Sequence, residues 1–429
     1  MLDIKLIREN SDIVKKGIVK KNANPKLVDD FLVIDQKWRE FVKKIDDARA
    51  KQKDLSEKRK IEEAKGVKTQ IQIWEEELKT IETDRTDLLY IIPNLPADDV
   101  PVGKDESKNV VLRKWGNLSK FNFAPQDHLQ IGESLDIIDV KKAGEIAGSR
   151  FYYLKGAAAL LEYALVNWVF SRLSNPKFTQ KIAKKISPKF PGTPFIPVVP
   201  PVMIKPEVYI KMARLDPGQE VEKFFISRDN LYLVGSAEHT LGPLHMDEII
   251  DEAKFPIRYL GFSTAFRREA GSYGKDVRGI LRAHQFDKLE METFSLPGLS
   301  MQEQNFIVAI QEALMRELKM PYRVVEICTG DMGGPDVRQI DIETWMPGQN
   351  KYRETHTSDF MADYQSRRLN TKVRFKDGKI EFVHMNDATA FAIGRIIIAI
   401  LENYQRKDGS VKIPEVLQKY MGGLKVIKR

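Results

Sequence analysis

The sequence predicts an α+β protein, in which a long antiparallel pair of helices precedes a domain built on a mainly antiparallel β-sheet. Three features of the 429-residue chain support this prediction. Heptad spacing runs through residues 27–92, a proline-rich break occupies residues 93–109, and strand patterns without regular strand–helix alternation follow. Because a chain of this length exceeds the size at which one hydrophobic core keeps growing, we expect two or three domains.

The apolar residues of the first expected helix recur at alternating intervals of four and three, as in a coiled coil. They are Leu27, Phe31, Ile34, Trp38, Phe41, Ile45, Ala48 and Leu55. After Gly66 the pattern returns with Ile71, Trp74, Leu78, Ile81, Leu88 and Ile92. We therefore expect two antiparallel helices joined by a short turn that contains Gly66.

The far end of this arm is rich in basic residues. They are Lys51, Lys53, Lys58, Arg59, Lys60, Lys65 and Lys68. A run of charge at the end of a coiled coil is usually solvated surface. A long arm with a cationic end equally suits the binding of a phosphate backbone away from the protein body. From charge alone, both interpretations stay open.

The clearest domain boundary is the break after the second helix, where proline and glycine recur at Pro93, Pro96, Pro101 and Gly103. We expect an N-terminal domain over residues 1–105, including the arm at about 27–92, and a second domain over residues 106–429.

The second domain is expected to contain helices at about 157–173 and from Thr389 to Tyr404. Its strand patterns lie around residues 194–204, 231–235, 257–263, 283–294, 323–328, 339–346, 351–357 and 380–384. The segment 194–204 contains three prolines, and proline is tolerated only at a sheet edge or beside an interface.

Bulk composition limits the kind of protein further. The 69 Lys and Arg exceed the 61 Asp and Glu by eight, a mild preference for polyanions. The single cysteine, Cys328, rules out an intrachain disulfide and a multi-cysteine zinc site. The start, MLDIKLIREN, lacks the apolar run of a signal peptide, and the run IIIAIL at 396–401 is too short to cross a bilayer. We expect a soluble protein of the cytoplasm.

The segment 266–294, FRREAGSYGKDVRGILRAHQFDKLEMETF, has the pattern of a long β-hairpin with a glycine-rich, cationic tip. In a strand, alternate side chains share a face, so Arg267 lies beside Glu269. The same alternation places His284, Phe286, Lys288 and Glu290 together.

This hairpin offers the groups that bind a nucleotide. A guanidinium such as that of Arg267 binds phosphate oxygens, the Glu269 carboxylate accepts from an exocyclic amine, and the Phe286 ring stacks on a base. In the loop, Lys275, Arg278 and Arg282 are candidates for outer phosphates. An exposed hairpin stabilised by salt bridges remains the alternative.

A second polar group occurs in GQNKYRETHTSDFMADYQSRR, where Glu354 lies two strand positions from His356 and close to Thr357. Another carboxylate, Glu343, lies in the preceding strand. Mg²⁺ binds oxygen ligands and prefers substrate phosphates as partners, so these residues predict a magnesium site. Arg395 lies in an otherwise apolar helix, where an arginine is rare unless it pairs with a carboxylate or contacts a ligand.

These motifs resemble motifs 2 and 3 of class II aminoacyl-tRNA synthetases, and the whole chain resembles the zinc-free seryl-tRNA synthetase family. The matching phrases, in chain order, are MLDIKLIREN, IPNLP, VPVGKDES, FRREAGSYGKDVRG, HQFDKLEME, LENYQ and PEVLQKYMGG. The resemblance implies a six-stranded antiparallel catalytic domain over residues 106–429 and a coiled-coil arm that binds the long variable arm of serine tRNA. It also implies a homodimer through motif 1, here the helix from about 157 and the strand ending at Pro200-Pro201, in which the arm of one subunit serves the active site of the other.

The resemblance further implies a serine–tRNA ligase that forms seryl-adenylate from L-serine and ATP and transfers it to tRNA(Ser); the family also permits tRNA(Sec). The implied ATP-binding residues are Arg267, Arg268, Glu269, Phe286, Glu354, Thr355, His356, Thr357 and Arg395, of which Arg267, Glu354 and Arg395 are the catalytic ones. Glu354 and Thr357 are the implied Mg²⁺ ligands. The implied serine-binding residues are Ser236, Ala237, Glu238, Arg267, Glu290 and Thr389, and the implied tRNA-binding residues are Lys51, Lys53, Lys58, Arg59, Lys60 and Lys65.

The chain departs from the family pattern around the amino-acid pocket. Ser236 replaces a threonine, THTSDF replaces ISSCSNF, and NDATAFA replaces NGSGLA, which adds the charge of Asp387 beside Thr389. A pocket that hydrogen-bonds a hydroxyl rejects analogues without it strongly but rejects an added methyl poorly. Two other functions stay open: a ligase that loads an acceptor other than tRNA, and an inactive RNA-binding homologue.

Overall fold

The structure, a computed structural model, describes residues 1–270 and 279–429. It divides into two compact units, Met1–Pro96 and Ala97–Arg429. The expected functional boundary between residues 105 and 106 remains a prediction. No helix within the described ranges is both long and apolar enough to pass through a membrane.

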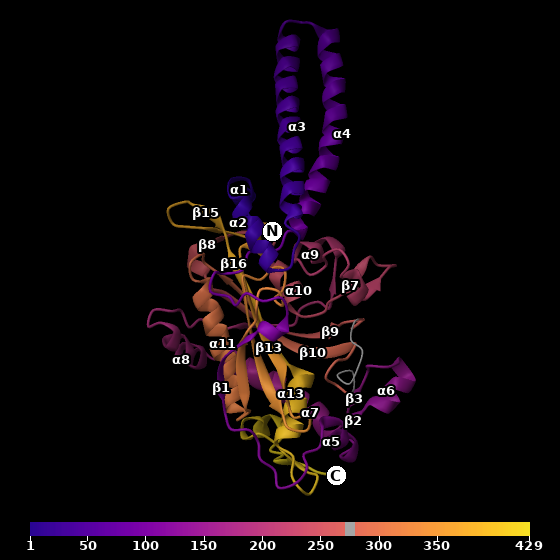
Figure 1. Cartoon of the computed structure of the whole chain (residues 1–429), viewed down its shortest axis with the longest axis vertical. Coiled ribbons are helices and arrows are strands. Elements are labelled where there is room, and N and C mark those ends of the chain that lie inside the picture. Colours follow the sequence, from indigo (N-terminus) through magenta and orange to yellow (C-terminus); the bar gives the residue numbers. More distant parts are fainter. Residues whose placement is uncertain (271–278) are drawn as a thin grey trace. The chain divides into compact units, whose positions relative to one another are not determined.

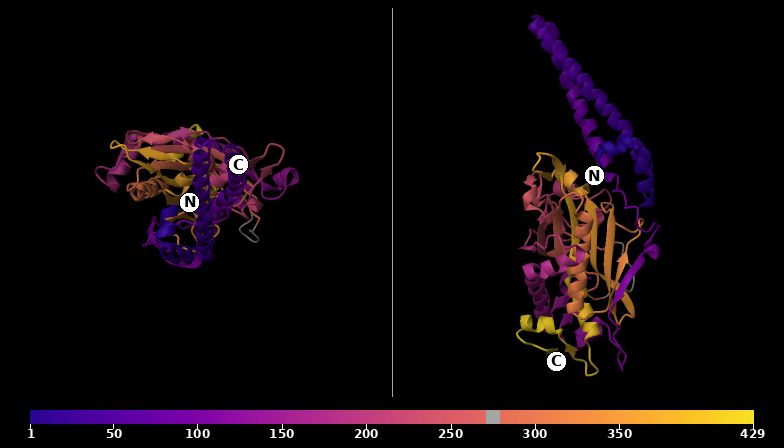
Figure 2. Two further views of the ribbon diagram at one scale, coloured as in Figure 1. Left: turned by 90° about the horizontal axis from the view of Figure 1, so that it is seen from above. Right: turned by 90° about the vertical axis from the view of Figure 1, so that its left-hand side faces the viewer.

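The first unit consists of helices in its described residues (Figure 1). They are α1 (Ile4–Glu9), α2 (Ser11–Lys20), α3 (Lys26–Glu57) and α4 (Ile61–Ile91). The long helices α3 and α4 run antiparallel, and the right-hand view of Figure 2 shows the pair from another side. Phe31 and Ile45 of α3 are buried, as are Ile71 and Ile81 of α4, so the heptad positions form the seam between the helices as expected.

The turn between α3 and α4 does not contain Gly66, and that part of the sequence prediction is wrong. The chain reverses at Lys58–Lys60, where Arg59 has a positive φ of 58° and Lys60 N–H bonds Leu55 C=O at 2.9 Å. Gly66 lies inside α4 in open space. A glycine costs a helix only about 1 kcal/mol relative to alanine, so strong helix formers around it continue the helix.

A buried carboxylate joins three helices of the first unit at the base of the arm. Asp35 of α3 has no exposed surface, and accepts hydrogen bonds from Arg8 of α1 and Arg85 of α4 at 2.7–2.8 Å. Burial alone would raise the pKa of Asp35, but these two guanidinium groups hold it below its usual value. The heptad count did not predict this residue, because it occupies an interface position with a charge.

The second unit is organised around an eight-stranded sheet in its described residues (Figure 1). Its order is β1 (Val110–Trp115), β11 (Tyr322–Glu326), β12 (Arg338–Met346), β13 (Lys351–Ala362), β16 (His384–Ala392), β10 (Gln285–Ser295), β9 (Ile257–Phe266) and β4 (Ile196–Val198). The central strands from β11 to β9 are antiparallel, whereas β4 adds in parallel at the edge. The α+β prediction is confirmed, and the expected six antiparallel strands form the middle of a wider sheet.

Small sheets and helices surround this sheet. The small sheets comprise β2 (Ile138–Asp139) with β3 (Tyr153–Leu154), β5 (Met203–Ile204) with β7 (Leu231–Leu233) and β6 (Phe225–Ile226), β8 (Ile249–Asp251) with β14 (Lys372–Arg374) and β15 (Ile380–Phe382), and β17 (Val411–Lys412) with β18 (Val426–Ile427). The α-helices are α5 (His128–Ser134), α6 (Val140–Ala147), α7 (Ala157–Leu173), α8 (Pro176–Ile186), α9 (Pro206–Lys211), α10 (Glu238–Leu241), α11 (Ser300–Glu317), α12 (Tyr364–Leu369), α13 (Ile393–Asn403) and α14 (Glu415–Gln418).

One face of the main sheet carries the hydrophobic core. Phe391 of β16 packs against Trp168 of α7, and Phe306 of α11 packs against Phe190 in the same cluster. On β10 the core residues are Leu289 and Met291. Because strand side chains alternate, the residues between them face the opposite side of the sheet, where the candidate site lies.

The last helix begins later than the sequence predicts. Residues from Thr389 to Ala392 belong to β16, and α13 starts only at Ile393. Residues 389–392 pair with β10, and the preceding residues 385–388 pair with both β10 and β13, so tertiary pairing overrides the helix propensity of this alanine-rich segment.

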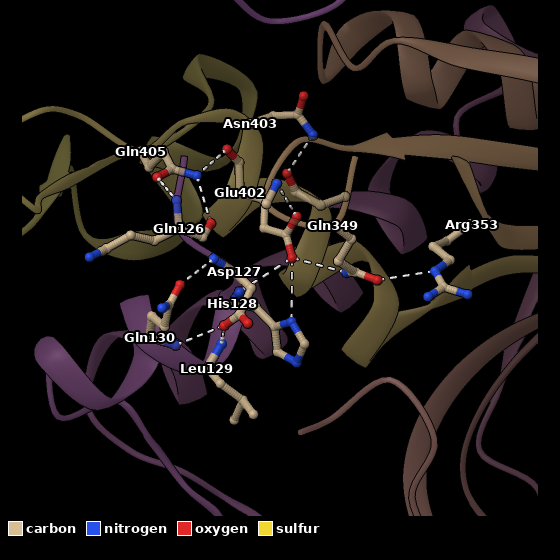
Figure 3. Close-up of polar contacts among 12 residues, drawn as sticks. Gln126, Asp127, His128, Leu129, Gln130, Gln349, Arg353, Glu402, Asn403 and Gln405 are labelled. Carbon is tan, nitrogen blue, oxygen red and sulfur yellow. Dashed lines mark hydrogen bonds and ion pairs between the residues drawn. The ribbon is translucent and has the colours of Figure 1, made fainter. Parts of the chain in front are cut away.

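A polar network fixes the end of α13 (Figure 3). The buried Glu402 carboxylate accepts from Gly348 N–H at 2.9 Å, from Gln349 at 3.0 Å and from the backbone N–H of His128 at 3.3 Å. Gln405 exchanges two hydrogen bonds with the backbone of Gln126 at 2.8 and 2.9 Å. The sequence LENYQ thus holds α13, whose first turn carries Arg395, in a fixed position.

Candidate active site

A solvent-open pocket of about 900 Å³ lies on the polar face of the main sheet. Residues named in the sequence analysis line much of it: Glu238, Arg267, Glu269, Arg282, Phe286, Lys288, Glu290, Glu354, Thr355, Thr357, Thr389 and Arg395. They come from α10, β10, β13, β16, the start of α13 and two loop segments. The pocket therefore collects most of the predicted site residues from segments far apart in the sequence.

Arg267 and Glu269 reach the pocket from a loop rather than from a strand. Strand β9 ends at Phe266, and Glu269 has a positive φ of 51°. The Arg267 side chain donates from Nε to Gly235 C=O at 3.0 Å, and its guanidinium lies 5.4 Å from the Phe286 ring centre. Glu269 forms an ion pair with Arg282 at 3.2 Å. The two residues share the pocket, although strand alternation was the wrong reason to expect it.

Arg268 does not line this pocket. Its Nε donates to Lys223 C=O at 2.8 Å, and its guanidinium lies 4.8 Å from the Phe224 ring. Of the other loop cations, Lys275 and Arg278 lie outside the described residues.

A β-bulge decides which residues of β13 face the pocket. Glu343 pairs with Glu354 and Ile342 pairs with His356, so Thr355 is an extra residue in the ladder. This extra residue places Glu354 on the same face as Thr357, with Oγ1 and Oε1 3.5 Å apart.

His356 consequently faces the core instead of the pocket. It has no exposed surface and packs edge-on against Phe391, and burial lowers its pKa to about 3. The expectation that His356 lies beside Glu354 is therefore wrong. Simple alternation does not hold across a bulge.

Arg395 contacts Glu354 directly. Its Nη1 lies 2.9 Å from Glu354 Oε1 and 3.0 Å from the Glu354 carbonyl oxygen. The Glu354 side chain is 49% exposed; its partial desolvation opposes ionisation, but Arg395, Lys288 and Arg267 outweigh this effect and hold the pKa of this carboxyl below its usual value. Glu354 is thus an anion at the pocket wall.

The acidic groups near Glu354 are limited in number. Asp341, opposite Thr357, is nearly buried, and burial with the nearby Glu354 charge raises its pKa well above the usual value. Glu343 pairs with Arg323 and does not line the pocket. Within the described ranges, no three or more His, Cys, Asp or Glu side chains gather to bind a metal. One carboxylate and one hydroxyl suit Mg²⁺, which takes its remaining ligands from water and phosphate.

The deeper end of the pocket is built around Lys288. Its Nζ lies 2.8 Å from the Glu290 carboxylate and donates to Ser236 Oγ at 2.9 Å. Burial raises the pKa of Glu290 to about 8, with Glu238 and Asp387 adding to the shift and Lys288 opposing it. Ser236 and Ala237 are fully buried and do not line the pocket, whereas Glu238 does.

Thr389 lies opposite Glu290 in the β10–β16 ladder and lines the same end of the pocket. Two charged lining residues, Arg214 and Asp359, were not predicted. Arg214 follows α9 in an irregular segment, where no periodicity points to it. Asp359 could have been found by counting two positions on from Thr357 along β13.

The chain is similar to one family over both units. The model of the seryl-tRNA synthetase N-terminal domain matches residues 1–96, and the model of the class II tRNA synthetase core domain (G, H, P, S and T) matches residues 223–404. The chain is 38% identical to the serine–tRNA ligase of Dictyoglomus turgidum over 434 residues, which cover 98% of both chains. It is 38% identical to that of Thermotoga maritima over 437 residues, 98% of this chain and 99% of the relative.

Solved structures give the same result. The seryl-tRNA synthetase of Pyrococcus horikoshii complexed with ATP matches with a TM-score of 0.88 and 35% identity, covering 100% of this chain and 99% of the other. The cytoplasmic serine–tRNA ligase of Naegleria fowleri in complex with AMP matches with a TM-score of 0.85 and 31% identity over the same shares. A prolyl-tRNA synthetase of Giardia lamblia, 12% identical with a TM-score of 0.53 over 67% of this chain and 54% of the other, shares the fold.

Proposed function

The chain belongs to the seryl-tRNA synthetase family, and from this premise we propose how its pocket and its helical arm divide the work of a serine–tRNA ligase. The enzyme of this family joins serine to tRNA at the expense of ATP. The observation that carries the proposal is that Arg267, Glu269, Phe286, Glu354 and Arg395, from four separate segments, line one cavity.

ATP occupies the mouth of this cavity. Arg267 binds the α-phosphate, and Glu269 accepts from the adenine amino group. Phe286, 5.4 Å from the Arg267 guanidinium, stacks on the adenine ring, and Arg395 contacts the outer phosphates. Arg267 is already oriented by the Gly235 carbonyl, which leaves its terminal nitrogens for phosphate oxygens. Arg268 is directed at Phe224 and supports the loop instead of the nucleotide.

Serine occupies the deeper end. The Glu290 carboxylate binds the serine ammonium, with Glu238 nearby, and Arg267 reaches the carboxylate. Ser236 and Ala237 act from behind, since Ser236 Oγ accepts from Lys288 and thereby orients the lysine beside Glu290. Thr389, opposite Glu290, lies at the wall of the amino-acid side chain.

Glu354 and Thr357 fit a Mg²⁺ ion, because they present one ionised carboxylate and one hydroxyl on the same pocket face. Bound there with ATP, the ion neutralises phosphate charge. In the structure Arg395 already neutralises Glu354. When ATP binds, Arg395 must therefore shift relative to the Glu354 carboxylate.

The first step is an in-line attack of the serine carboxylate on the α-phosphorus. The carboxylate oxygen bonds to phosphorus, the bond to the bridging oxygen breaks, and pyrophosphate leaves. The pocket contributes by positioning, and Arg267 stabilises negative charge that develops on the α-phosphate oxygens. The terminal ribose hydroxyl of tRNA then attacks the seryl carbonyl, and AMP leaves.

The arm binds tRNA through its cationic end, at Lys51, Lys53, Lys58, Arg59, Lys60 and Lys65. All six are exposed, so they are accessible to a phosphate backbone. Its long variable arm makes tRNA(Ser) the fitting acceptor, and tRNA(Sec) is the second candidate. A tRNA acceptor agrees with the cytoplasmic location that we expect from the sequence.

A homodimer forms through α7 and the edge strand β4. Leu160 and Tyr163 on α7 expose 54% and 62% of their surface, and Ile196 and Val199 at the edge strand expose 54% and 80%. Large exposed apolar side chains of this kind suit burial against a second copy of the chain. Analytical ultracentrifugation of Tyr163→Asp and Val199→Asp should give monomers; dimers in both variants would contradict the interface.

The function is tested by ATP–pyrophosphate exchange with serine, threonine and alanine in parallel, followed by charging of labelled serine onto tRNA. Serine should support the fastest exchange, only with Mg²⁺ present, and the label should move to tRNA(Ser). Transfer to a protein acceptor alone would favour the ligase with another substrate. Absence of exchange with any amino acid would favour the inactive RNA-binding homologue.

A further inference from the structure

Arg214 enters the deep end of the pocket from the irregular segment after α9. It follows Ala213, which has a positive φ of 55°, and its side chain is 18% exposed. Its Nη2 lies 2.6 Å from Asp387 Oδ2 on β16 and 3.8 Å from Asp359 Oδ2 on β13. Two neighbouring strands thus fix one terminal nitrogen of this guanidinium.

The rest of the guanidinium is not used in the same way. The Nε of Arg214 is buried and has no hydrogen-bond acceptor among the described residues. Nε is closed to the pocket, but the side chain as a whole keeps 18% of its surface exposed, so a terminal N–H of the guanidinium is the group that a ligand in the pocket can reach. Arg214 itself lines the pocket, together with Glu238, Glu290 and Thr389.

The proposed function gives the serine hydroxyl only one neighbouring polar group, the Thr389 hydroxyl, and no charged donor. Arg267 takes the carboxylate and Glu290 the ammonium, so the serine side chain points toward the remaining wall, where Arg214 lies near Thr389. Resting on that function, we propose that Arg214 is a serine-binding and specificity-determining residue, whose guanidinium donates a hydrogen bond to the substrate hydroxyl.

The surroundings explain how an arginine can serve here. Glu238, Glu292, Asp359 and Asp387 all lie close to Arg214, and its charge offsets theirs. Asp387, two positions before Thr389 on β16, makes the shorter of the two carboxylate contacts with the Arg214 guanidinium. Asp387 therefore orients the Arg214 guanidinium as a hydrogen-bond donor, and the charge of Arg214 lowers the free-energy cost of burying these carboxylates.

The donor has a consequence for selectivity. Alanine would leave the Arg214 N–H buried without an acceptor, which a site built to hydrogen-bond a hydroxyl penalises strongly. Threonine carries the same hydroxyl, so Arg214 does not weaken its binding relative to serine. The residue therefore separates serine from alanine, and does not separate serine from threonine.

A simpler possibility is that Arg214 only neutralises Asp387. Three variants of the full chain separate the two: Arg214→Met, Asp387→Asn, and the double variant, which removes the arginine together with its nearest carboxylate and so leaves the net charge unchanged. The readouts are KM and kcat for serine, alanine, threonine and ATP in pyrophosphate exchange, with thermal melting as a check of folding.

We expect the double variant to melt close to the parent chain, yet to show a serine KM raised about 100-fold and a serine-over-alanine preference lowered by a similar factor. Its KM for ATP should stay within about twofold and its serine-over-threonine ratio should hardly move. Arg214→Met alone should add a lower melting temperature. Asp387→Asn, which keeps the donor, should raise the serine KM less than Arg214→Met does.

Recovery of the serine KM and of alanine rejection in the double variant would overturn the assignment, because Arg214 would then act only through Asp387. Equal loss in Asp387→Asn and Arg214→Met would overturn it as well. If the parent chain itself gives no serine-dependent exchange, it is the proposed function that fails and not this residue's role within it.

Discussion

The charges of the pocket and those of the arm tip are built in opposite ways. In the pocket, Lys288 exposes 12% of its side chain and contacts Glu290 on its own strand and Ser236 from the segment just before α10. At the tip, Lys58 and Lys65 expose 63% and 66% of their side chains and pair with Asp54 and Glu62, which lie four and three residues away in the chain.

This difference predicts how each region responds to change. Buried charges interact strongly and in one geometry, so removing one group disturbs its partners. Exposed pairs contribute about 0–1 kcal/mol each and are screened by salt. We therefore expect large effects of single changes in the pocket that depend little on salt, and small, cumulative, salt-dependent effects at the tip.

The largest effect is expected for Arg267→Ala. Loss of the α-phosphate contact should lower kcat/KM for serine-dependent pyrophosphate exchange about a thousandfold or more, because the group acts on charge that develops during the reaction. The adjacent Arg268→Ala is the matched control, since Arg268 points to Lys223 and Phe224, and its loss should stay within about tenfold.

Circular dichroism and melting should show both variants folded. Near-normal exchange in Arg267→Ala, or equal losses in the two variants, would contradict the placement of ATP in the pocket. The expected contrast between pocket charges and arm-tip charges would then no longer hold.

The next effect separates the two regions completely. Replacing residues 27–92 by a short Gly-Ser linker removes the arm, which lies wholly within the first unit, and leaves the second unit intact. Serine-dependent exchange should remain within about threefold, whereas tRNA charging should fall about a hundredfold or more through loss of phosphate contacts. An equal fall of both activities would show that the arm supports the pocket itself.

In both regions, the sequence predicts correctly those residues that follow a regular helical or strand periodicity. The heptad positions Phe31 and Ile45 are buried, and the alternation of Phe286, Lys288 and Glu290 along β10 places all three in the pocket. Both patterns survive because nothing interrupts the helix or strand that carries them.

The residues that sequence reasoning misplaced lie where a period is broken. The extra residue Thr355 turns His356 into the core and brings Thr357 to Glu354. Arg214 follows a left-handed residue in an irregular segment, and its role depends on Asp387, more than 170 positions away. A bulge and a long-range ion pair are tertiary features, and one sequence does not contain their geometry.

A smaller effect is expected at the arm tip, where six cations fall into two sets. Lys51, Lys53 and Arg59 have no ion pair among the described residues, whereas Lys58, Lys60 and Lys65 each pair with a carboxylate three or four residues away in the chain. Changing the unpaired triple to alanine should raise the KM for tRNA about tenfold at low salt and lower the salt slope of log KM by up to about 0.9 per lost contact.

The paired triple should have a smaller effect, because its cations must leave a carboxylate before they bind phosphate. Exposed Lys184, Lys185 and Lys189 in the second unit give a control triple with the same change in charge, for which we expect less than about a twofold change. A control triple as damaging as the tip would mean that net charge, rather than the arm, determines tRNA affinity.

The smallest effect concerns stability rather than activity, and it tests whether pocket charges are costly as well as useful. Glu292 has no exposed surface, and neither of its carboxylate oxygens has a hydrogen-bond partner in the described structure. Burial, followed by the nearby charge of Asp387, raises the pKa of Glu292 well above the usual value.

The folded chain therefore keeps this carboxyl protonated at a pH where the unfolded chain, with a pKa of about 4.3, has lost the proton. Its stabilising contribution is complete below that pH and is lost as the pH rises, by at most about 1.4 kcal/mol per pH unit. Glu292→Gln cannot ionise, so its melting temperature should gain on the parent chain as the pH rises above the unfolded-state pKa, until the folded carboxyl itself ionises, while the exposed Glu133→Gln should follow the parent throughout. Parallel curves for Glu292→Gln and the parent chain would mean that this buried carboxylate finds a partner, and that the pocket tolerates its charge more easily than the arrangement of its neighbours indicates.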